Sequence, residues 1–331
     1  MDLWKTVFVD GGARYGLHPT MADYPAPKRV HAFEPDPGES AYLAEKYAGD
    51  GDYVVNGVAL SDTPGTIELN VLGHRGMSTT RTPNAESLWL RDIRPDEGAV
   101  QEKLEIECTT LDRYFAAIDV SPDFIKLDIE GHELAALKGA ETVLGDTLAL
   151  NIELVFSDVF GHVPAPQILE FLLNEHPFML VNLDYDGRGY PMSSMQPGDR
   201  FGVVVGCEAF FVRKPEAVAS GNDEVDLPRF VKLAVFAFRN RAGDLACRIV
   251  EHEIAGGGRR DAFAAALKKD VPLARYLELL FLRHAHRIKN VNPDAFSAAA
   301  ALYQAAFGAA YPDRERFFRR TDELSRLLSS G

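Results

Sequence analysis

Cysteine is scarce in this chain of 331 residues. Its cysteines, Cys108, Cys207 and Cys247, are odd in number and far apart, so they fit neither a disulfide framework nor a zinc-ligand pattern. Such usage is typical of a reducing compartment. Long apolar runs are also missing, and no stretch reaches the length of a membrane span. Because no basic and apolar signal segment follows Met1, we expect a cytoplasmic protein.

Basic residues are few in the front part of the chain. Residues 1–227 hold 17 Lys and Arg against 38 Asp and Glu, which gives a net charge of −21. Residues 228–331 hold 18 against 11, which gives +7, and the two parts sum to −14. The negative charge of residues 1–227 argues against a nucleic-acid partner. The positive charge of residues 228–331 either complements the charge of residues 1–227 or faces an anionic group such as a phosphate.

The remaining composition fits a soluble globular protein, with 46% hydrophobic and 25% charged residues. Alternating strand and helix patterns continue to about residue 215, and only helical patterns follow residue 228. We therefore predict an α/β domain over residues 1–215, a linker over residues 216–227 and an all-helical domain over residues 228–331.

A glycine-rich turn between two strand patterns opens the chain. The apolar run Thr6–Val9 ends at Asp10, and Gly11-Gly-Ala-Arg-Tyr-Gly16 follows. A second apolar run, Val30–Phe33, ends at Glu34. Glycines let backbone N–H groups approach a ligand closely, and an acid at the end of the second strand accepts hydrogen bonds from ribose hydroxyls. The pattern predicts the start of a nucleotide-binding β–α–β unit.

The stretch from Phe124 to Ala140 concentrates polar chemistry at the end of a strand. An apolar strand pattern covers Phe124–Ile129, and a helix pattern through Leu134 and Leu137 ends at Gly139. Four polar residues lie within six positions here: Asp128 near the end of the strand pattern, and Glu130, His132 and Glu133 after it. Ligands of open α/β sheets bind beyond the carboxyl ends of the strands, so we expect the chemistry at this edge.

Further patterns complete the predicted domains. Strand patterns occur at residues 52–60, 66–71, 104–108, 148–156, 178–183 and 201–212, and helix patterns at 39–47, after an N-cap at Thr110, and at 165–175, 274–288 and 295–310. Residues 73–98 and 184–200 are rich in loop-forming residues. Within the first of these loops, Met77–Thr80 is a candidate contact for a cofactor or substrate.

In their order along the chain, these motifs resemble the FkbM family of S-adenosylmethionine-dependent methyltransferases. The matching segments are Val7–Gly16, His31–Pro35, Asn56–Ser61, Thr110–Asp112, Phe124–Ala140 and Ile152–Glu153. The resemblance implies an α/β fold with a seven-stranded, Rossmann-like class I methyltransferase sheet, mostly parallel with one reversed strand. It covers roughly residues 5–213 and leaves out the C-terminal all-helical region. It also implies O-methylation of a hydroxyl of a sugar, glycan or hydroxylated natural product.

The resemblance implies roles for single residues. S-adenosyl-L-methionine would be held at its methionine half by the turn residues Asp10, Gly11, Gly12, Ala13 and Gly16. Glu34 would take the ribose hydroxyls, Ala59 and Leu60 would lie near the adenine, and Asp128 would face the methionine amino group or the reacting centre. Arg14 departs from the family, which usually has a small polar residue such as Asn there.

Methyl transfer from a sulfonium is an in-line displacement, so the enzyme chiefly supplies alignment. An alcohol acceptor also benefits from a base that removes its proton. His132 is the first candidate because its ordinary pKa suits that role near neutral pH. Glu130 and Glu153 are the alternatives, and each of these residues also has a purely structural interpretation.

We assign no resident metal from the sequence. An open alternative has Asp128, Glu130, His132 and Glu153 holding a divalent metal that lowers the pKa of the acceptor.

Two other functions stay open at this point. A nicotinamide-dependent oxidoreductase would use the same turn, but Ala13 replaces the middle glycine of the dehydrogenase fingerprint. A non-catalytic cofactor-binding or scaffold protein would use the helical region to dock a partner. That region is alternatively a homodimer surface or a lid over the site for a small-molecule or glycan acceptor.

Overall fold

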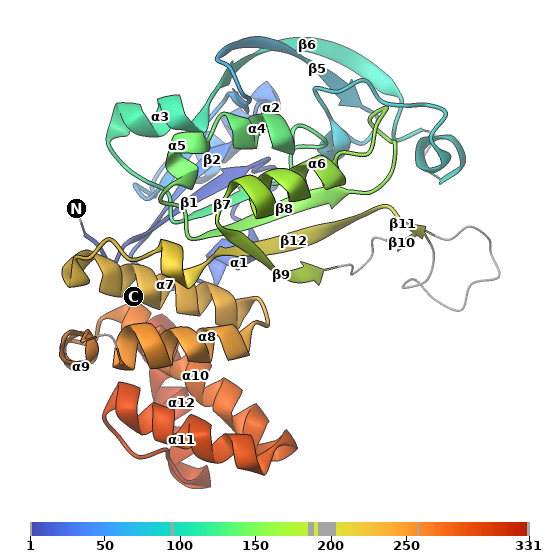
Figure 1. Cartoon of the computed structure of the whole chain (residues 1–331). Coiled ribbons are helices and arrows are strands. Elements are labelled where there is room, and N and C mark those ends of the chain that lie inside the picture. The colour runs from blue at the N-terminus through green and yellow to red at the C-terminus, as the bar shows by residue number, and fades with distance from the viewer. Residues whose placement is uncertain (1, 94–95, 185–188, 191–202, 257, 330–331) are drawn as a thin grey trace. The chain divides into compact units, whose positions relative to one another are not determined.

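A computed structural model describes residues 2–93, 96–184, 189–190, 203–256 and 258–329 (Figure 1). The chain divides into two compact units, each described here by itself. The α/β unit comprises Val7–Ala22 and Arg29–Phe211. The helical unit comprises Met1–Thr6, Asp23–Lys28 and Val212–Gly331.

A seven-stranded sheet forms the centre of the α/β unit within the described residues. Its order is β3-β2-β1-β7-β8-β12-β9. The strands are β1 (Thr6–Gly11), β2 (Lys28–Phe33), β3 (Tyr53–Asn56), β7 (Phe124–Leu127), β8 (Ala149–Val155), β9 (Phe178–Asp184) and β12 (Gly206–Arg213). The pairs β1–β7, β7–β8 and β2–β3 are parallel, whereas the arrow of β12 runs opposite to that of β8 in Figure 1. The prediction of a mostly parallel seven-stranded sheet is confirmed.

Buried apolar residues explain why β7 and β8 lie in the middle of the sheet. Every residue of both strands is buried, as is typical of parallel strands covered on both faces. Ile125 and Ile152, on one face, belong to the same core cluster as Leu137 of α4 (Glu133–Lys138). Figure 1 shows α4 on this face together with α3 (Leu111–Ile118), α5 (Glu141–Leu144) and α6 (Ala165–Glu170). Lys126 alternates to the other face, beside Asp10.

A separate three-stranded sheet was not foreseen from the sequence. It contains β4 (Ala59–Leu60), β6 (Val100–Thr109) and β5 (Gly65–Leu72), with β5 and β6 antiparallel. The strand expected over residues 52–60 is therefore divided. β3 ends at Asn56 in the large sheet, and β4 pairs with β6 in the small one. Leu69, Val71 and Ile106 give the small sheet its own core.

The remaining elements of the α/β unit are short. They are α1 (Pro19–Ala22), α2 (Pro37–Lys46), η1 (Arg75–Met77), η2 (Trp89–Ile93), η3 (Phe171–Glu175), β10 (Gly189–Tyr190) and β11 (Val203–Val204). The loop expected at residues 184–200 lies largely outside the described residues. Thr110 is the N-cap of α3, as predicted, and its side chain accepts a hydrogen bond from the backbone N–H of Arg113 at 3.0 Å.

The C-terminal part of the chain is helical, as predicted. Its elements are η4 (Pro215–Ala217), α7 (Asp223–Arg239), α8 (Gly243–Ile249), η5 (Val250–Ala255), α9 (Arg260–Lys268), α10 (Pro272–Val291), α11 (Pro293–Phe307) and α12 (Arg314–Ser329). The segment expected as a linker, residues 216–227, contains the start of α7, which the Asn222 side chain caps. Whether residues 1–215 and 228–331 act as separate domains stays a prediction.

Buried polar contacts hold the last helices together. Glu278 of α10 is 3% exposed and accepts hydrogen bonds from Tyr303 of α11 at 2.9 Å and from Arg320 of α12 at 2.9 and 2.8 Å. This carboxylate therefore links three helices. Among the described residues, no helix combines the length and apolar character needed to cross a membrane.

Candidate functional site

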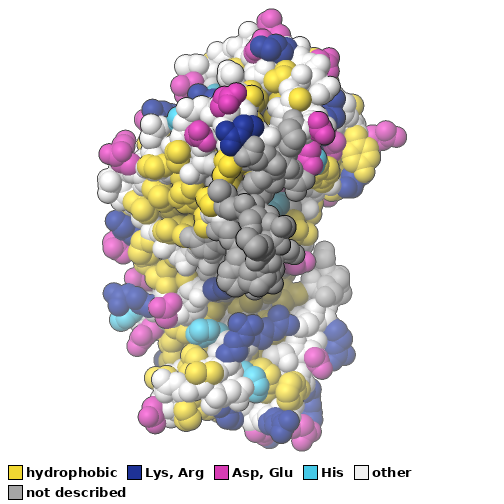
Figure 2. All heavy atoms as spheres, turned by 90° about the vertical axis from the view of Figure 1, so that its right-hand side faces the viewer, with side chains coloured by type: hydrophobic (Ala, Val, Ile, Leu, Met, Phe, Trp, Pro, Cys, Tyr) yellow, Lys and Arg dark blue, Asp and Glu magenta, His cyan; other side chains and the backbone are white. Residues whose placement is uncertain are grey.

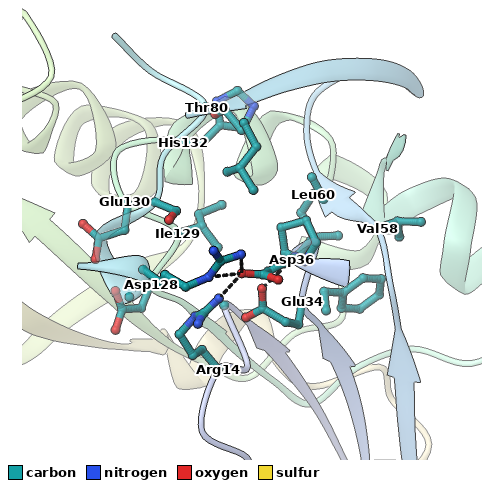
Figure 3. A pocket seen from close by; sticks show the side chains of 18 of the residues that line it. Arg14, Glu34, Asp36, Val58, Leu60, Thr80, Asp128, Ile129, Glu130 and His132 are labelled. Carbon is teal, nitrogen blue, oxygen red and sulfur yellow. Dashed lines mark hydrogen bonds and ion pairs between the residues drawn. The ribbon is translucent and has the colours of Figure 1, made fainter. Parts of the chain in front are cut away.

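A cavity opens in the α/β unit at the carboxyl ends of the strands (Figure 3). Gly12 follows β1, Glu34 follows β2, and Asp128 follows β7, and all three residues line this cavity. The predicted residues Ala59, Leu60, Glu130 and His132 also line it. The structure therefore brings together segments from four separate parts of the sequence, at the edge where open α/β sheets bind ligands.

The glycine turn after β1 packs directly against the end of β7. Gly12 has a φ of +76°, and a Cβ atom there would lie 1.9 Å from the backbone oxygen of Asp128. The N–H groups of Gly12 and Ala13 donate to the carbonyl of Phe33 at 3.0 and 3.2 Å. Only glycine allows this approach. The turn therefore joins the ends of β1, β2 and β7 into one surface.

Asp10 is buried beside this turn and does not line the cavity. It is 1% exposed, and its Oδ1 lies 3.2 Å from Nζ of Lys126. Burial raises the pKa of Asp10, and Lys126 opposes the shift. Lys126 Nζ also donates to the carbonyls of Gly11 and Gly12 at 3.3 and 3.0 Å. The structure thus gives Asp10 a place behind the turn. Gly11, Ala13 and Gly16 likewise shape the turn and do not line the cavity.

Glu34 presents a buried carboxyl group to the cavity. It is 4% exposed, and its Oε1 accepts a hydrogen bond from the backbone N–H of Asp36 at 2.9 Å. Burial raises the pKa of Glu34 to about 7, although the Asp36 N–H and Arg14 oppose the shift. The ionised form is therefore destabilised until donors reach it.

An ion cluster beside Glu34 was missed at the sequence level. Asp36 Oδ2 accepts hydrogen bonds from the guanidinium of Arg14 and from Nε and Nη2 of Arg75, the latter two at 3.1 and 2.8 Å. Burial would raise the pKa of Asp36, but Arg75, the N–H of Glu39 and Arg14 together lower it. Figure 3 shows Arg14 directed at the Asp36 carboxylate. Arg14 therefore forms part of an ion cluster at the cavity.

One wall of the cavity is apolar. Ala59 and Leu60 of β4 are 6% and 3% exposed. Phe33, Val58, Leu69 and Ile129 add further apolar surface to the lining. A flat aromatic group is favoured against such a wall.

The loop after β7 has a strained backbone that a buried acid stabilises. Glu130 and Gly131 have φ values of +55° and +92°. Glu133 is fully buried, and its Oε1 accepts hydrogen bonds from the N–H groups of Ile129 at 2.9 Å and Gly131 at 3.2 Å. Burial raises the pKa of Glu133 to about 7, against the effect of these hydrogen bonds. Glu133 therefore holds the backbone that carries Asp128 and Glu130.

The loop that contains the candidate contact Met77–Thr80 reaches the same backbone. Ser78 and Thr80 line the cavity. Thr79 Oγ1 donates to the carbonyl of Glu130 at 2.6 Å, and Nε of Arg81 donates to the carbonyl of Gly131 at 3.1 Å. This segment thus contributes both to the lining and to the support of the β7 loop. Thr79 and Arg81 were not singled out from the sequence.

His132 is buried at the start of α4, where it is the N-cap residue and is 8% exposed. Its Nε2 lies 3.0 Å from Oγ of Ser61, and its Nδ1 is buried without a hydrogen-bond partner in the described part of the chain. Burial, with the nearby charge of Arg81, lowers the pKa of His132 to about 4. The imidazole is therefore neutral near pH 7. His18, which also lines the cavity, has its pKa lowered to about 4 by burial.

Three acids converge beside the cavity. One carboxylate oxygen each from Asp128, Glu130 and Glu153 lies within 4.8 Å of the others. Glu153, on β8, is 6% exposed and does not itself line the cavity. Such a set of oxygen atoms is suited to a divalent cation. His132, which the metal alternative also included, is not part of this group.

Comparison with known proteins identifies the family. The family model described as the methyltransferase FkbM domain matches residues 10–190. This match covers more than half of the chain, and the chain belongs to the FkbM methyltransferase family.

A similar solved structure is that of methyltransferase FkbM from Methylobacillus flagellatus KT. The identity is 19%, the TM-score is 0.35, and the similarity covers 63% of this chain and 44% of that one. This chain thus spans less than half the length of that structure. No curated protein matches the chain.

Proposed function

We propose that this FkbM-family methyltransferase uses S-adenosyl-L-methionine to methylate a hydroxyl oxygen of a sugar, glycan or hydroxylated natural product. The observation that carries the proposal is the position of Glu34. Its buried carboxyl group faces a cavity that the Gly12 turn and Asp128 also line. An acid at the end of the second strand, beside a glycine turn, is suited to a ribose.

The residues around the cavity fit this cofactor. The raised pKa of Glu34 shows a carboxylate that lacks compensation for its burial, and two ribose hydroxyls would supply donors to it. The apolar wall at Val58 and Leu60 suits an adenine ring. Asp128 carries a side chain that is 30% exposed and suits an ammonium group. S-adenosyl-L-methionine supplies an activated methyl group on a sulfonium when it is bound.

The acceptor hydroxyl must lose its proton, and we propose that a residue near the β7 loop takes it. Glu130 lines the cavity beside Asp128, and its carboxylate is suited to accept that proton. His132 is neutral near pH 7, but Ser61 occupies its Nε2 and its Nδ1 is covered. The imidazole can act as a base only if the acceptor displaces Ser61 from Nε2 or reaches the buried Nδ1. Glu153 does not line the cavity and acts only through Asp128 and Glu130, beside which its carboxylate lies.

A divalent metal held by Asp128, Glu130 and Glu153 is the alternative way to lower the acceptor's pKa. Treatment of the protein with EDTA distinguishes the metal mechanism from the mechanism with a side-chain base alone. Retention of the full rate of methyl transfer excludes the metal, whereas loss that Mg²⁺ or Mn²⁺ restores supports it.

Calorimetric titration of the full chain tests the cofactor directly. We expect saturable binding of S-adenosyl-L-methionine and S-adenosylhomocysteine, and none of NAD. Glu34→Gln should weaken binding about tenfold, as expected for loss of a charge-assisted hydrogen bond. Glu45→Gln is the matched control, because Glu45 is an exposed acid of α2 that does not line the cavity. Tight binding of NAD alone would contradict the proposal.

Transfer of a labelled methyl group to a panel of hydroxylated acceptors tests the reaction itself. Cofactor binding without transfer to any acceptor would favour the scaffold function. Light scattering of the full chain tests the proposed homodimer through the helical region.

A further inference from the structure

A second cavity lies within the helical unit, between the end of α10 and the start of α12. The residues that define its chemistry are His286, Lys289, Tyr311, Arg314, Phe317 and Phe318. This cavity lies outside residues 10–190, which the family model matches. It therefore shares no residue with the site of the methyl-transfer proposal.

Aromatic rings form the floor and one edge of this cavity. The rings of His286 and Phe317 stack with centroids 4.4 Å apart and an interplanar angle of 19°. Phe317 is 6% exposed and forms part of the floor, whereas Phe318 is 50% exposed and forms an edge. The ring of Phe318 stands at 80° to that of Phe317, so Phe318, beside the stacked His286–Phe317 pair, offers the exposed aromatic surface for a planar ring.

Two cations at the cavity have no acidic partner. Lys289 and Arg314 are exposed, and neither makes an ion pair with any residue that the structure describes. The acids next to Arg314 in sequence contact other residues, and Asp313 Oδ1 accepts the backbone N–H of Arg316 at 2.9 Å. Asp313 Oδ2 lies 3.6 Å from Nε of Arg316, and Glu315 Oε1 lies 2.9 Å from Nη2 of Arg319. Figure 2 shows Lys and Arg side chains gathered with histidine and apolar side chains over the helical part of the chain.

The position of Arg314 distinguishes this cavity from an ordinary basic surface. Lys289 lies in the last turn of α10 and is 5.1 Å from the ring of Phe296, so the helix dipole and that ring both stabilise it. Arg314 is the first residue of α12, where the helix dipole disfavours a cation. A bound anion between Lys289 and Arg314 would relieve this unfavourable placement.

We propose that this cavity binds a small organic anion that carries a planar ring. The ring stacks on Phe318 beside the His286–Phe317 pair, and the anionic group lies between Lys289 and Arg314. An aryl phosphate and an aromatic carboxylate share this chemistry, and separate probes distinguish them.

Calorimetry on the full chain with 4-nitrophenyl phosphate and with 4-nitrobenzoate tests the site. We expect saturable binding of at least one of these probes, and the stronger one identifies the anionic group. Lys289→Gln combined with Arg314→Gln should weaken that binding at least about tenfold. Arg287→Gln combined with Arg326→Gln removes the same charge from the same two helices outside the cavity and should leave the affinity within about twofold.

Two further measurements separate the contribution of the ring to binding from that of the charge. Phe318→Ala, at an exposed position, should weaken the ring-bearing probes about fivefold and leave the fold intact. Neutral 4-nitrobenzyl alcohol and inorganic phosphate should each bind more weakly than the ring-bearing anions. Absence of saturable binding by both ring-bearing probes at millimolar concentration overturns the proposal. Equal losses in the two double variants, or inorganic phosphate that binds as well as the aryl anions, also overturn it.

Discussion

The Nζ atom of Lys126 lies 3.2 Å from Oδ1 of Asp10, and both side chains are almost completely buried. Burial by itself would lower the pKa of Lys126, but the charges of Asp10 and Asp128 outweigh it and raise that pKa. The ammonium also binds the carbonyls of Gly11 and Gly12. One cation therefore fixes the turn after β1 to the end of β7, behind the cavity.

Removal of Lys126 should destabilise the fold strongly. Lys126→Met leaves the Asp10 carboxylate buried without its cation, a change that costs about 3–5 kcal/mol. Urea unfolding measures the loss. Lys126→Met combined with Asp10→Asn removes both charges and should recover much of it. Additive losses in the double variant would show that the pair is not energetically coupled.

Cofactor affinity should depend on pH through Glu34. In the ligand-free protein the pKa of Glu34 is raised to about 7 by burial. Below this pH the carboxyl group is protonated and accepts fewer hydrogen bonds from the ribose hydroxyls. Affinity should therefore rise with pH up to about 7 and level off above it, with up to about a tenfold loss per pH unit below. Calorimetry between about pH 5.5 and 8.5 measures the profile.

The same titration with Glu34→Gln provides the internal check on this profile. Its affinity should be lower near pH 8 and should change little with pH. A variant that keeps the wild-type pH profile would assign the dependence to another group, such as His18.

Two substitutions of Glu133 should differ in their effect on the free energy of unfolding. Glu133→Ala leaves the N–H groups of Ile129 and Gly131 without their acceptor, at a cost of about 1–3 kcal/mol each. Glu133→Gln keeps a carbonyl oxygen for both donors and removes the buried charge. At pH 8 the Gln variant should be at least as stable as the wild type, and the Ala variant clearly less stable.

The pH dependence of stability follows from the same group. The folded pKa of Glu133, about 7, is higher than the ordinary value of 4.5, so the folded protein holds a proton that the unfolded chain releases. This contribution to stability is fully present below about pH 4.5 and is lost as the pH rises through about 7. Urea unfolding at pH 5 and pH 8 should show a smaller decrease for Glu133→Gln than for the wild type. An equal decrease would contradict the assignment.

The sheet and part of the site could be predicted because their signals are local. The apolar runs before Asp10, Glu34 and Asp128 each indicate a strand, and the acid after each run marks its carboxyl end. Parallel strands bring such ends to one edge. The cavity-lining positions of Glu34 and Asp128 follow from this rule alone.

The remaining features depend on contacts between distant residues. Arg14 and Arg75 meet at Asp36, which is 22 residues from one and 39 from the other. His132 is buried, and its Nε2 lies 3.0 Å from Oγ of Ser61, 71 residues away. Alternation predicts that residues 66–71 and 104–108 form strands, but it does not specify that they pair with each other, and the second with β4, in a sheet of their own. The choice of strand partners and the burial of polar groups are decided by tertiary packing.

Gly12 and Gly161 allow backbone strain to be separated from close packing. Their φ values are nearly equal, at +76° and +79°. A Cβ atom at Gly12 would lie 1.9 Å from the Asp128 oxygen, whereas one at Gly161 would meet no atom within 4 Å. Gly161→Ala should therefore show only the left-handed backbone cost, about 1–2 kcal/mol. Gly12→Ala adds the displacement of the β7 end and should cost about 3 kcal/mol or more, with cofactor binding lost. Urea unfolding and calorimetry measure both effects, and equal costs in the two variants would show that the turn after β1 yields without disturbing β7.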